Sequence, residues 1–179
     1  FYYSINAVNN PQYHISIQLE IGNKNDVETS LAIPFDFINK SFCNIVTESE
    51  FWSNDIKGPS YKTIFITEKT MKPISNNQPF ILVSSAHSLK KLKELGFKTF
   101  DKWWDESYDN EIDDEKRLLK IVEIVKYINT FSLNELQNIY VQMKETFEHN
   151  IKVYNQYKQF GHQLSVLFPS PFNSFECFI

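Results

Sequence analysis

The segment at 65–83 constrains the fold of this chain more than any other part of the sequence. It reads FITEKTMKP over 65–73 and QPFILV over 78–83. This pattern predicts the end of an apolar strand, a polar turn, a short helix and a second apolar strand. A strand, a helix and a strand in this order form a βαβ unit with parallel strands. Binding groups of such units gather at the carboxyl ends of the strands, so the polar turn is a candidate site.

The first helical turn of this segment carries Thr67, Glu68 and Lys69. Thr67 is a good N-cap, because its hydroxyl can accept a hydrogen bond from an otherwise unpaired amide. Glu68 lies where the helix dipole favours a carboxylate, and Lys69 can reach an anion bound over the same amides. A carboxylate for sugar hydroxyls beside an ammonium for phosphates suits a nucleotide-sugar site. A plain helix cap with a solvated lysine is the commoner origin of such residues, since charged residues in a first helical turn are frequent, and both interpretations stay open at this point.

Neighbouring segments extend this unit into a larger α/β sheet. A strand is predicted over 42–46 and ends in a second Thr-Glu pair, so parallel strands would bring Glu48 and Glu68 to one rim of the sheet. Leucines at 89, 92 and 95 predict an amphipathic helix that ends at Gly96, and 97–100 predicts another short strand. We therefore expect an α/β fold with a Rossmann-like, open and mainly parallel sheet.

The C-terminal third is predicted to be helical, with two or more long helices. Asp113 or Asp114 is the expected N-cap of the first helix, and a capping box at 132–135 opens a second helix that continues through Ile151. Gly161 is expected to end the helical run. In the N-terminal part, alternating apolar residues over 13–21 predict a strand. The expected divisions are an N-terminal segment (1–40) that is a remnant of an acceptor domain or a link to one, an α/β donor-binding core (41–112), a helical region (113–160) and a C-terminal tail (161–179).

Composition excludes several classes of function. The 179 residues carry a net charge of −4, and Arg117 is the single arginine, so the clustered basic surface of a duplex-binding protein is not expected. Cys43 and Cys177 belong to no metal or redox motif, which favours free thiols in a reducing compartment, with one distant disulfide as the alternative. The chain has no long apolar run and no signal-peptide pattern, so a cytoplasmic location is predicted, which for a viral protein is the host cytoplasm.

Several familiar catalytic motifs are missing. Four glycines cannot build a glycine-rich phosphate cradle, and no nucleophile elbow occurs. The acidic stretch at 101–114 lacks the glycine of a calcium loop, which makes a metal site the weaker interpretation. The two other interpretations of this stretch are a loop that leads into a helix and a loop that lies across a ligand cleft. We expect no metal and no cofactor. The chain starts with Phe1 in place of an initiating methionine, which suggests a processed product or part of a longer protein.

The ordered segments resemble the donor-binding C-terminal domain of GT-B glycosyltransferases. The α-1,3-fucosyltransferases resemble them most, and phage and environmental glycosyltransferase-like proteins are also similar. The likeness covers roughly residues 40–110 and includes the strand that ends at Glu48, the Phe-Ile-Thr-Glu-Lys element at 65–69 and the apolar strand at 79–83. It implies that Glu68 binds the donor ribose and Lys69 its phosphates, with Glu48 lining the same cleft. The candidate donor-nucleotide-binding residues that the resemblance implies are Glu48, Ser49, Phe65, Thr67, Glu68, Lys69 and Lys72.

This resemblance implies transfer of a sugar from a nucleoside diphosphate-sugar to an acceptor, which could be a glycan, a protein or a modified base. The chain departs from the family where Ser49-Glu50 replaces Asn-Ser, where Pro73 falls inside the donor helix, and where an upstream phosphate-binding arginine is missing. Forty N-terminal residues are also too few for an acceptor domain, so the catalytic base stays unassigned and a missing half or a partner chain is expected to supply it. The alternative is a non-catalytic, degenerate transferase-like domain that serves as a binding or structural module in a larger assembly.

Overall fold

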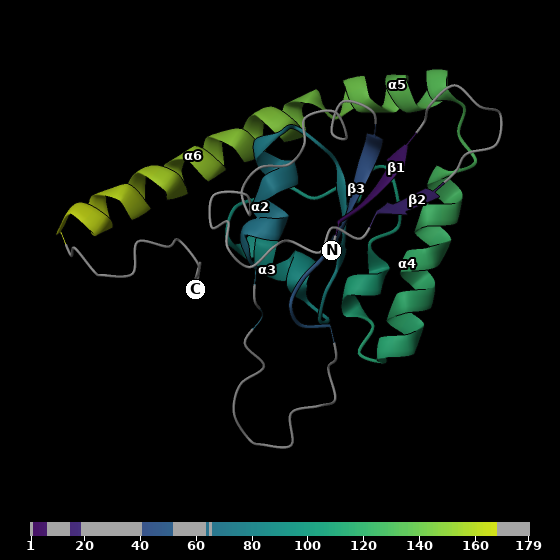
Figure 1. Cartoon of the computed structure of the whole chain (residues 1–179), viewed down its shortest axis with the longest axis horizontal. Helices are drawn as coiled ribbons and strands as arrows, with labels where there is room; N and C mark the ends of the chain where they lie inside the picture. The colour runs from purple at the N-terminus through teal and green to yellow at the C-terminus, as the bar shows by residue number, and fades with distance from the viewer. Residues whose placement is uncertain (1, 7–14, 19–40, 52–63, 65, 168–179) are drawn as a thin grey trace.

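The computed structural model of the chain describes residues 2–6, 15–18, 41–51, 64 and 66–167 (Figure 1). In this part the chain forms a mixed α/β structure, which confirms the predicted α/β class. The elements in chain order are β1 (Tyr2–Asn6), β2 (Ile15–Gln18), β3 (Ser41–Thr47), α2 (Glu68–Ser75), β4 (Phe80–Val83), α3 (Ser88–Glu94), the 3-10 helix η1 (Ser107–Asn110), α4 (Asp114–Ile128), α5 (Leu133–Gln142) and α6 (Lys144–Leu167).

The four described strands form one sheet in the order β2-β1-β3-β4. β1 pairs antiparallel with both β2 and β3, and the β3–β4 pair is parallel. The prediction of a mainly parallel sheet is therefore wrong for these strands. The difference arises from the N-terminal 40 residues, which contribute β1 and β2 to the same sheet. Strands close in sequence can pair antiparallel through a short connection, whereas a parallel pair needs a crossover.

The parallel pair is built from strands that are buried along most of their length. Residues 43–46 of β3 and residues 80–82 of β4 are all buried, as expected for strands covered on both faces. α2 lies between them in the chain, so a strand–helix–strand unit is present, but its first strand is β3 and not the segment predicted at 65–66. The strand predicted to end at Ile66 is not found among the described residues, where Ile66 makes only an isolated bridge. β3, and not that segment, is the neighbour of β4.

Most of the predicted helix boundaries are confirmed. Gly96 directly follows Leu95, the C-cap residue of α3, and has a φ of +91°. Glycine adopts this conformation at little cost. The Asp113 side chain caps α4, and Ser132 and Glu135 form the capping box of α5. α2 continues through Pro73 and ends two residues later.

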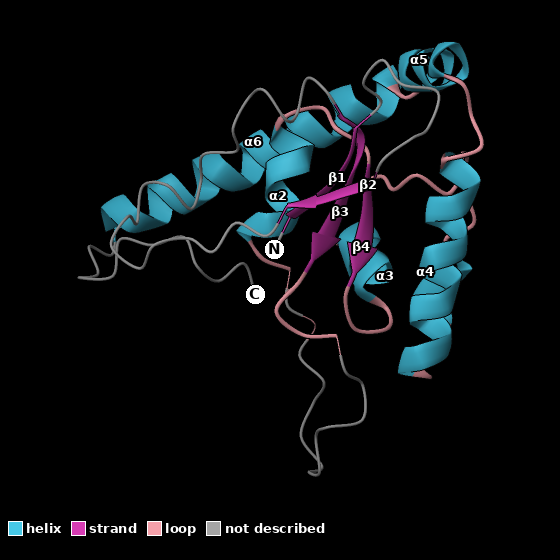
Figure 2. Cartoon of the chain, turned by 45° about the vertical axis from the view of Figure 1, so that its right-hand side comes forward, coloured by secondary structure: helices cyan, strands magenta, loops and turns pink. Residues whose placement is uncertain are grey.

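The long C-terminal helical run differs from the prediction in two places. It divides at Met143 into α5 and α6, and α6 then continues past Gly161 to Leu167. A single glycine costs a helix only about 1 kcal/mol relative to alanine, which a long helix can absorb. The predicted break at Gly161 is therefore wrong. α2 packs along α6 on one side of the sheet, while α4 lies on the other side next to β4 (Figures 1 and 2).

The ring of Phe100 connects α6 to the sheet. Its centroid lies 5.2 Å from that of Phe80 on β4, 5.3 Å from that of Trp104 and 6.1 Å from that of Phe147 on α6. All four side chains are buried. Aromatic pairs at such distances gain energy beyond the burial of their area, so this cluster holds the helical region on the α/β core.

The strand predicted at 97–100 is not formed. The backbone of Lys98 instead pairs with a side chain, because Oδ1 of Asn150 accepts from the Lys98 N–H at 2.8 Å and Nδ2 of Asn150 donates to the Lys98 carbonyl at 2.9 Å. Asn150 belongs to α6 and is 2% exposed. A side-chain amide thus takes the place that a neighbouring strand would occupy, and it pairs with both the N–H and the carbonyl of Lys98.

Replacing Asn150 by alanine is expected to lower the free energy of unfolding by about 1–3 kcal/mol, since two hydrogen bonds are lost from a buried position. Urea denaturation measures the change. Asn155→Ala is the matched control, because Asn155 is an exposed asparagine of the same helix. Equal stability of the two variants would contradict a structural role for the Asn150 amide.

Candidate functional site

The carboxyl ends of β3 and β4 lie side by side and continue to pair beyond the strands. The Glu48 N–H donates to the Val83 carbonyl at 3.0 Å, and the Ser85 N–H donates to the Glu50 carbonyl at 3.0 Å. The N-terminal turn of α2 joins this edge through Glu48. Open α/β sheets bind ligands at the carboxyl ends of their strands, so this edge is the candidate site.

Glu48 binds the start of α2. Its Oε1 accepts from the Thr67 N–H at 2.9 Å and from the Thr70 hydroxyl at 2.6 Å, while Oε2 accepts from the Thr67 hydroxyl at 2.7 Å. The side chain is buried. Both carboxylate oxygens are therefore used within the chain, at the helix end where the dipole favours a negative charge. The geometry gives Glu48 a capping function.

Thr67 and Lys69 complete the first turn of α2. Thr67 is the N-cap, as predicted, because its hydroxyl oxygen accepts from the Lys69 N–H at 3.3 Å. The Lys69 ammonium donates to the Ser49 hydroxyl at 3.0 Å, which brings α2 and the end of β3 together. Glu68 is half-buried, and its carboxylate makes no hydrogen bond or ion pair with another described residue. Its carboxylate is therefore available in the same turn as the Lys69 ammonium.

The structure thus brings together most of the residues predicted from the sequence. Glu48, Ser49, Thr67 and Lys69 are connected by hydrogen bonds, and Glu68 lies in the same turn. Lys72 lies one turn further along α2 and is buried, 8% exposed. Phe65, the remaining candidate, lies outside the described residues.

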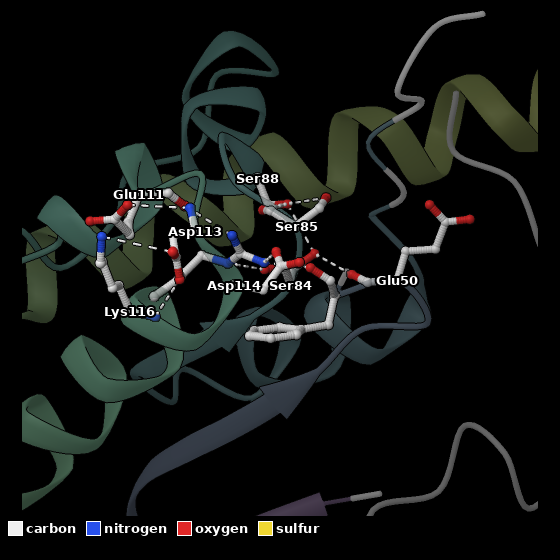
Figure 3. A network of polar contacts seen from close by, with 10 residues as sticks. Glu50, Ser84, Ser85, Ser88, Glu111, Asp113, Asp114 and Lys116 are labelled. Carbon is white, nitrogen blue, oxygen red and sulfur yellow. Dashed lines mark hydrogen bonds and ion pairs between the residues drawn. The ribbon is translucent and has the colours of Figure 1, made fainter. Parts of the chain in front are cut away.

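Arg117 is the residue at this edge whose role the sequence did not reveal. Its guanidinium donates to the carbonyls of Ser84 at 3.0 Å, Glu111 at 2.9 Å and Phe51, and it pairs with the Asp114 carboxylate at 2.6 Å (Figure 3). The group is 1% exposed and also lies over the Phe51 ring, 4.5 Å from its centroid. One side chain thus joins the loops after β3 and β4 to the start of α4. The available signal was a lone arginine three residues after an aspartate on a helix, which is ion-pair spacing.

The loop after β4 contains a residue in an unusual conformation. His87 has a φ of +72°, in the left-handed region that non-glycine residues seldom adopt, and its Nδ1 is buried without a hydrogen-bond partner. His87 occupies the N-cap position of α3, but its side chain makes no capping hydrogen bond. Asp109 of η1 caps the helix instead, since its carboxylate accepts from the N–H groups of Leu89 at 2.8 Å and Lys90 at 2.9 Å. Asp109 also holds the loop, because its carbonyl accepts from the His87 N–H at 2.7 Å.

The acidic stretch at 101–114 uses its buried carboxylates inside the fold. Glu106 accepts from the Thr99 hydroxyl at 2.5 Å and from the Phe100 N–H at 2.8 Å. Burial raises the pKa of Glu106 above its ordinary value, although these hydrogen bonds oppose the rise. Asp109 and Asp114 are likewise occupied with α3 and Arg117. In the part of the chain that the structure describes, no group of three or more metal-ligating side chains is found.

Cys43 is a poor candidate for a nucleophile. It is a free cysteine on β3 and has no exposed surface. Burial raises the pKa of its thiol far above the ordinary value, so the reactive thiolate is not formed near neutral pH. The thiol therefore serves as a small apolar group of the core, which agrees with the free thiol predicted for this position. Cys177 lies outside the described residues.

Comparison of the chain with family models, with curated proteins and with solved structures gives no match. Among the described helices, none is both long and apolar enough to cross a membrane. The residues at the carboxyl edge of β3 and β4, with their contacts, are therefore the features that indicate a function for this chain.

Proposed function

We propose that the chain is the donor-binding part of a sugar transferase and that the first turn of α2 holds a nucleoside diphosphate-sugar. The observation that carries this proposal is the position of Lys69, whose ammonium is held by Ser49 where the parallel strand β3 ends and α2 begins. A cation at a helix N-terminus can pair with a phosphate while the dipole of the helix favours the same anion. The Rossmann-like GT-B arrangement belongs to the same proposal.

The charge of Lys69 supports a phosphate ligand. Its partner Ser49 is neutral, and no carboxylate of the described residues lies within ion-pair distance of the Lys69 ammonium. The positive charge is therefore not compensated inside this part of the chain. Glu68 contributes a carboxylate that can accept from ribose or sugar hydroxyls. Glu48 acts indirectly in this proposal, because it holds the turn that carries the other two.

The reaction proposed for the complete protein is a displacement at the anomeric carbon. A bond forms between an acceptor oxygen and that carbon, and the bond from the carbon to the diphosphate oxygen breaks. The acceptor proton passes to a base that lies outside the residues assigned here. In this reaction Lys69 stabilises the negative charge that develops on the departing diphosphate.

Replacing Lys69 by alanine is expected to weaken binding of GDP or UDP by about 10- to 100-fold, since a hydrogen bond between charged groups contributes about 1.5–3 kcal/mol. Isothermal titration calorimetry with each nucleotide measures the change. Lys152→Ala is the matched control, because Lys152 is an exposed lysine on α6. The proposal fails if neither nucleotide binds the unmodified chain, or if the two variants bind the same nucleotide equally well.

A second candidate function is a non-catalytic, transferase-like module in a larger assembly. The observation that favours it is the internal use of the charged groups at this edge. Both oxygens of Glu48 are bonded within the chain, and Arg117 is occupied by three carbonyls and a carboxylate. If the titrations show no nucleotide binding while the chain remains folded, this second function is the better account.

A further inference from the structure

One face of α4 exposes large apolar side chains. Leu118 is 43% exposed, Leu119 64% and Val122 39%. α4 lies at the outer side of the molecule, with the sheet on one side of it (Figures 1 and 2). The opposite face of α4 is buried and carries Ile121, Ile124 and Ile128. The helix therefore has a second apolar stripe that the described part of the chain does not cover.

The apolar stripe has an acidic residue at one end and a basic residue at the other. Glu115, Leu119, Val122 and Lys126 follow one another at intervals of four, three and four residues, which is the seam spacing of a coiled coil. Glu115 lies in the first turn of α4 and Lys126 in the last. Both side chains are exposed, and the seam has an acid at one end and a base at the other.

Both charges can pair with groups outside the chain. Glu115 forms no ion pair with another described residue. Lys126 pairs with Glu123 at 2.8 Å, but the two side chains are 67% and 70% exposed. Exposed pairs of this kind contribute little and exchange readily, so a better placed carboxylate can replace Glu123.

We propose that two copies of the chain associate through this face, with their α4 helices antiparallel. In that arrangement Glu115 of each copy faces Lys126 of the other, and Leu119 faces Val122. A parallel arrangement would place Glu115 against Glu115 and Lys126 against Lys126, so the charges select the antiparallel one. A two-fold axis requires a surface that complements itself, and an apolar seam with an acid at one end and a base at the other meets that requirement.

The dimer is expected to be weak and reversible. Each copy contributes three large apolar side chains and two charges, which is small beside the interfaces of stable complexes. Association therefore depends on protein concentration, and this allows it to be measured. This face of α4 differs from the face that carries the nucleotide site, so dimerisation does not depend on the proposed function.

Sedimentation equilibrium of the chain over a concentration series tests the proposal. The weight-average mass is expected to rise from that of a monomer toward twice that value. Glu115→Lys should raise the dimer dissociation constant about tenfold, because it replaces two attractive pairs by repulsive ones. The double variant Glu115→Lys with Lys126→Glu should restore the original constant, since the charges complement each other again.

Two further variants and a folding check complete the experiment. Leu119→Glu should abolish association, because it places a charge in the apolar seam. Val141→Glu is the matched control, because Val141 is a 70% exposed apolar residue on α5, outside the seam. Circular dichroism confirms that each variant is folded. The proposal is overturned if the unmodified chain is monomeric throughout, if the double exchange fails to restore association, or if Val141→Glu weakens it as much as Leu119→Glu.

Discussion

Replacing Arg117 by methionine is expected to lower the free energy of unfolding by about 3–5 kcal/mol, the usual cost of removing one partner of a buried ion pair. The substitution leaves the Asp114 carboxylate buried without its cation and removes the donors to the carbonyls of Ser84, Glu111 and Phe51. Urea denaturation measures the change. An Arg117→Lys variant should recover little, because a single ammonium cannot reach groups on three separate segments.

A neighbouring residue supplies the control. Lys116→Met removes an exposed cation of the same helix, which pairs with Asp113 at 3.7 Å, and it should change stability by less than about 1 kcal/mol. Adding Asp114→Asn to Arg117→Met should recover part of the loss, because no uncompensated charge then remains buried. If Arg117→Met is as stable as Lys116→Met, the guanidinium does not hold these loops together.

Replacing Glu48 by alanine is expected to lower the free energy of unfolding by about 2–4 kcal/mol, because three hydrogen bonds to a charged acceptor are lost at a buried site. The cost should fall mainly on α2, since the partners are the Thr67 amide, the Thr67 hydroxyl and the Thr70 hydroxyl. Urea denaturation measures the total, and hydrogen exchange of the α2 amides shows whether that helix opens first. Glu48→Gln should lose less, because its carbonyl oxygen can still accept.

The adjacent carboxylate at position 50 provides the comparison. Glu50 is exposed, and its carboxylate points away from the neighbouring polar network (Figure 3). Glu50→Ala should therefore leave both stability and α2 exchange unchanged. A Glu48→Ala variant with normal stability and normal exchange, but with weaker nucleotide binding, would show that Glu48 contacts the ligand directly and that its capping contacts contribute little.

Local signals in the sequence were sufficient for most helices and for the two strands that form the parallel pair, although not for their pairing with each other. Thr67, Asp113 and Ser132 each begin a helix as predicted, because a capping side chain acts on amides two or three residues away. The apolar runs that became β3 and β4 are likewise local patterns, read from neighbouring residues. These features are short in range, so a single sequence contains nearly all the information that determines them.

The remaining features depend on contacts between residues far apart in the chain. The partners are 19 residues apart where Glu48 meets Thr67, 52 where Asn150 meets Lys98 and 66 where Arg117 meets Phe51. Nothing in the composition or spacing of the sequence shows which carboxylate caps which helix. Nor does it show that an asparagine side chain pairs with the backbone of Lys98 where a strand was predicted. The antiparallel pairing of β1 with β3 is hidden for the same reason.

The sequence by itself determined the α/β class, the starts of α2, α4 and α5, and the cluster of polar residues at the first turn of α2. Tertiary structure decided which of those side chains remain available to bind a ligand. Folding brings the Glu48 carboxylate to the Thr67 N–H and the Thr70 hydroxyl, because donors left unpaired at a buried position would be costly. It leaves the Glu68 and Lys69 side chains without an ion-pair partner among the described residues. The physical reason is that a side chain's role depends on which distant groups burial brings to it, and that is set only when the whole chain packs.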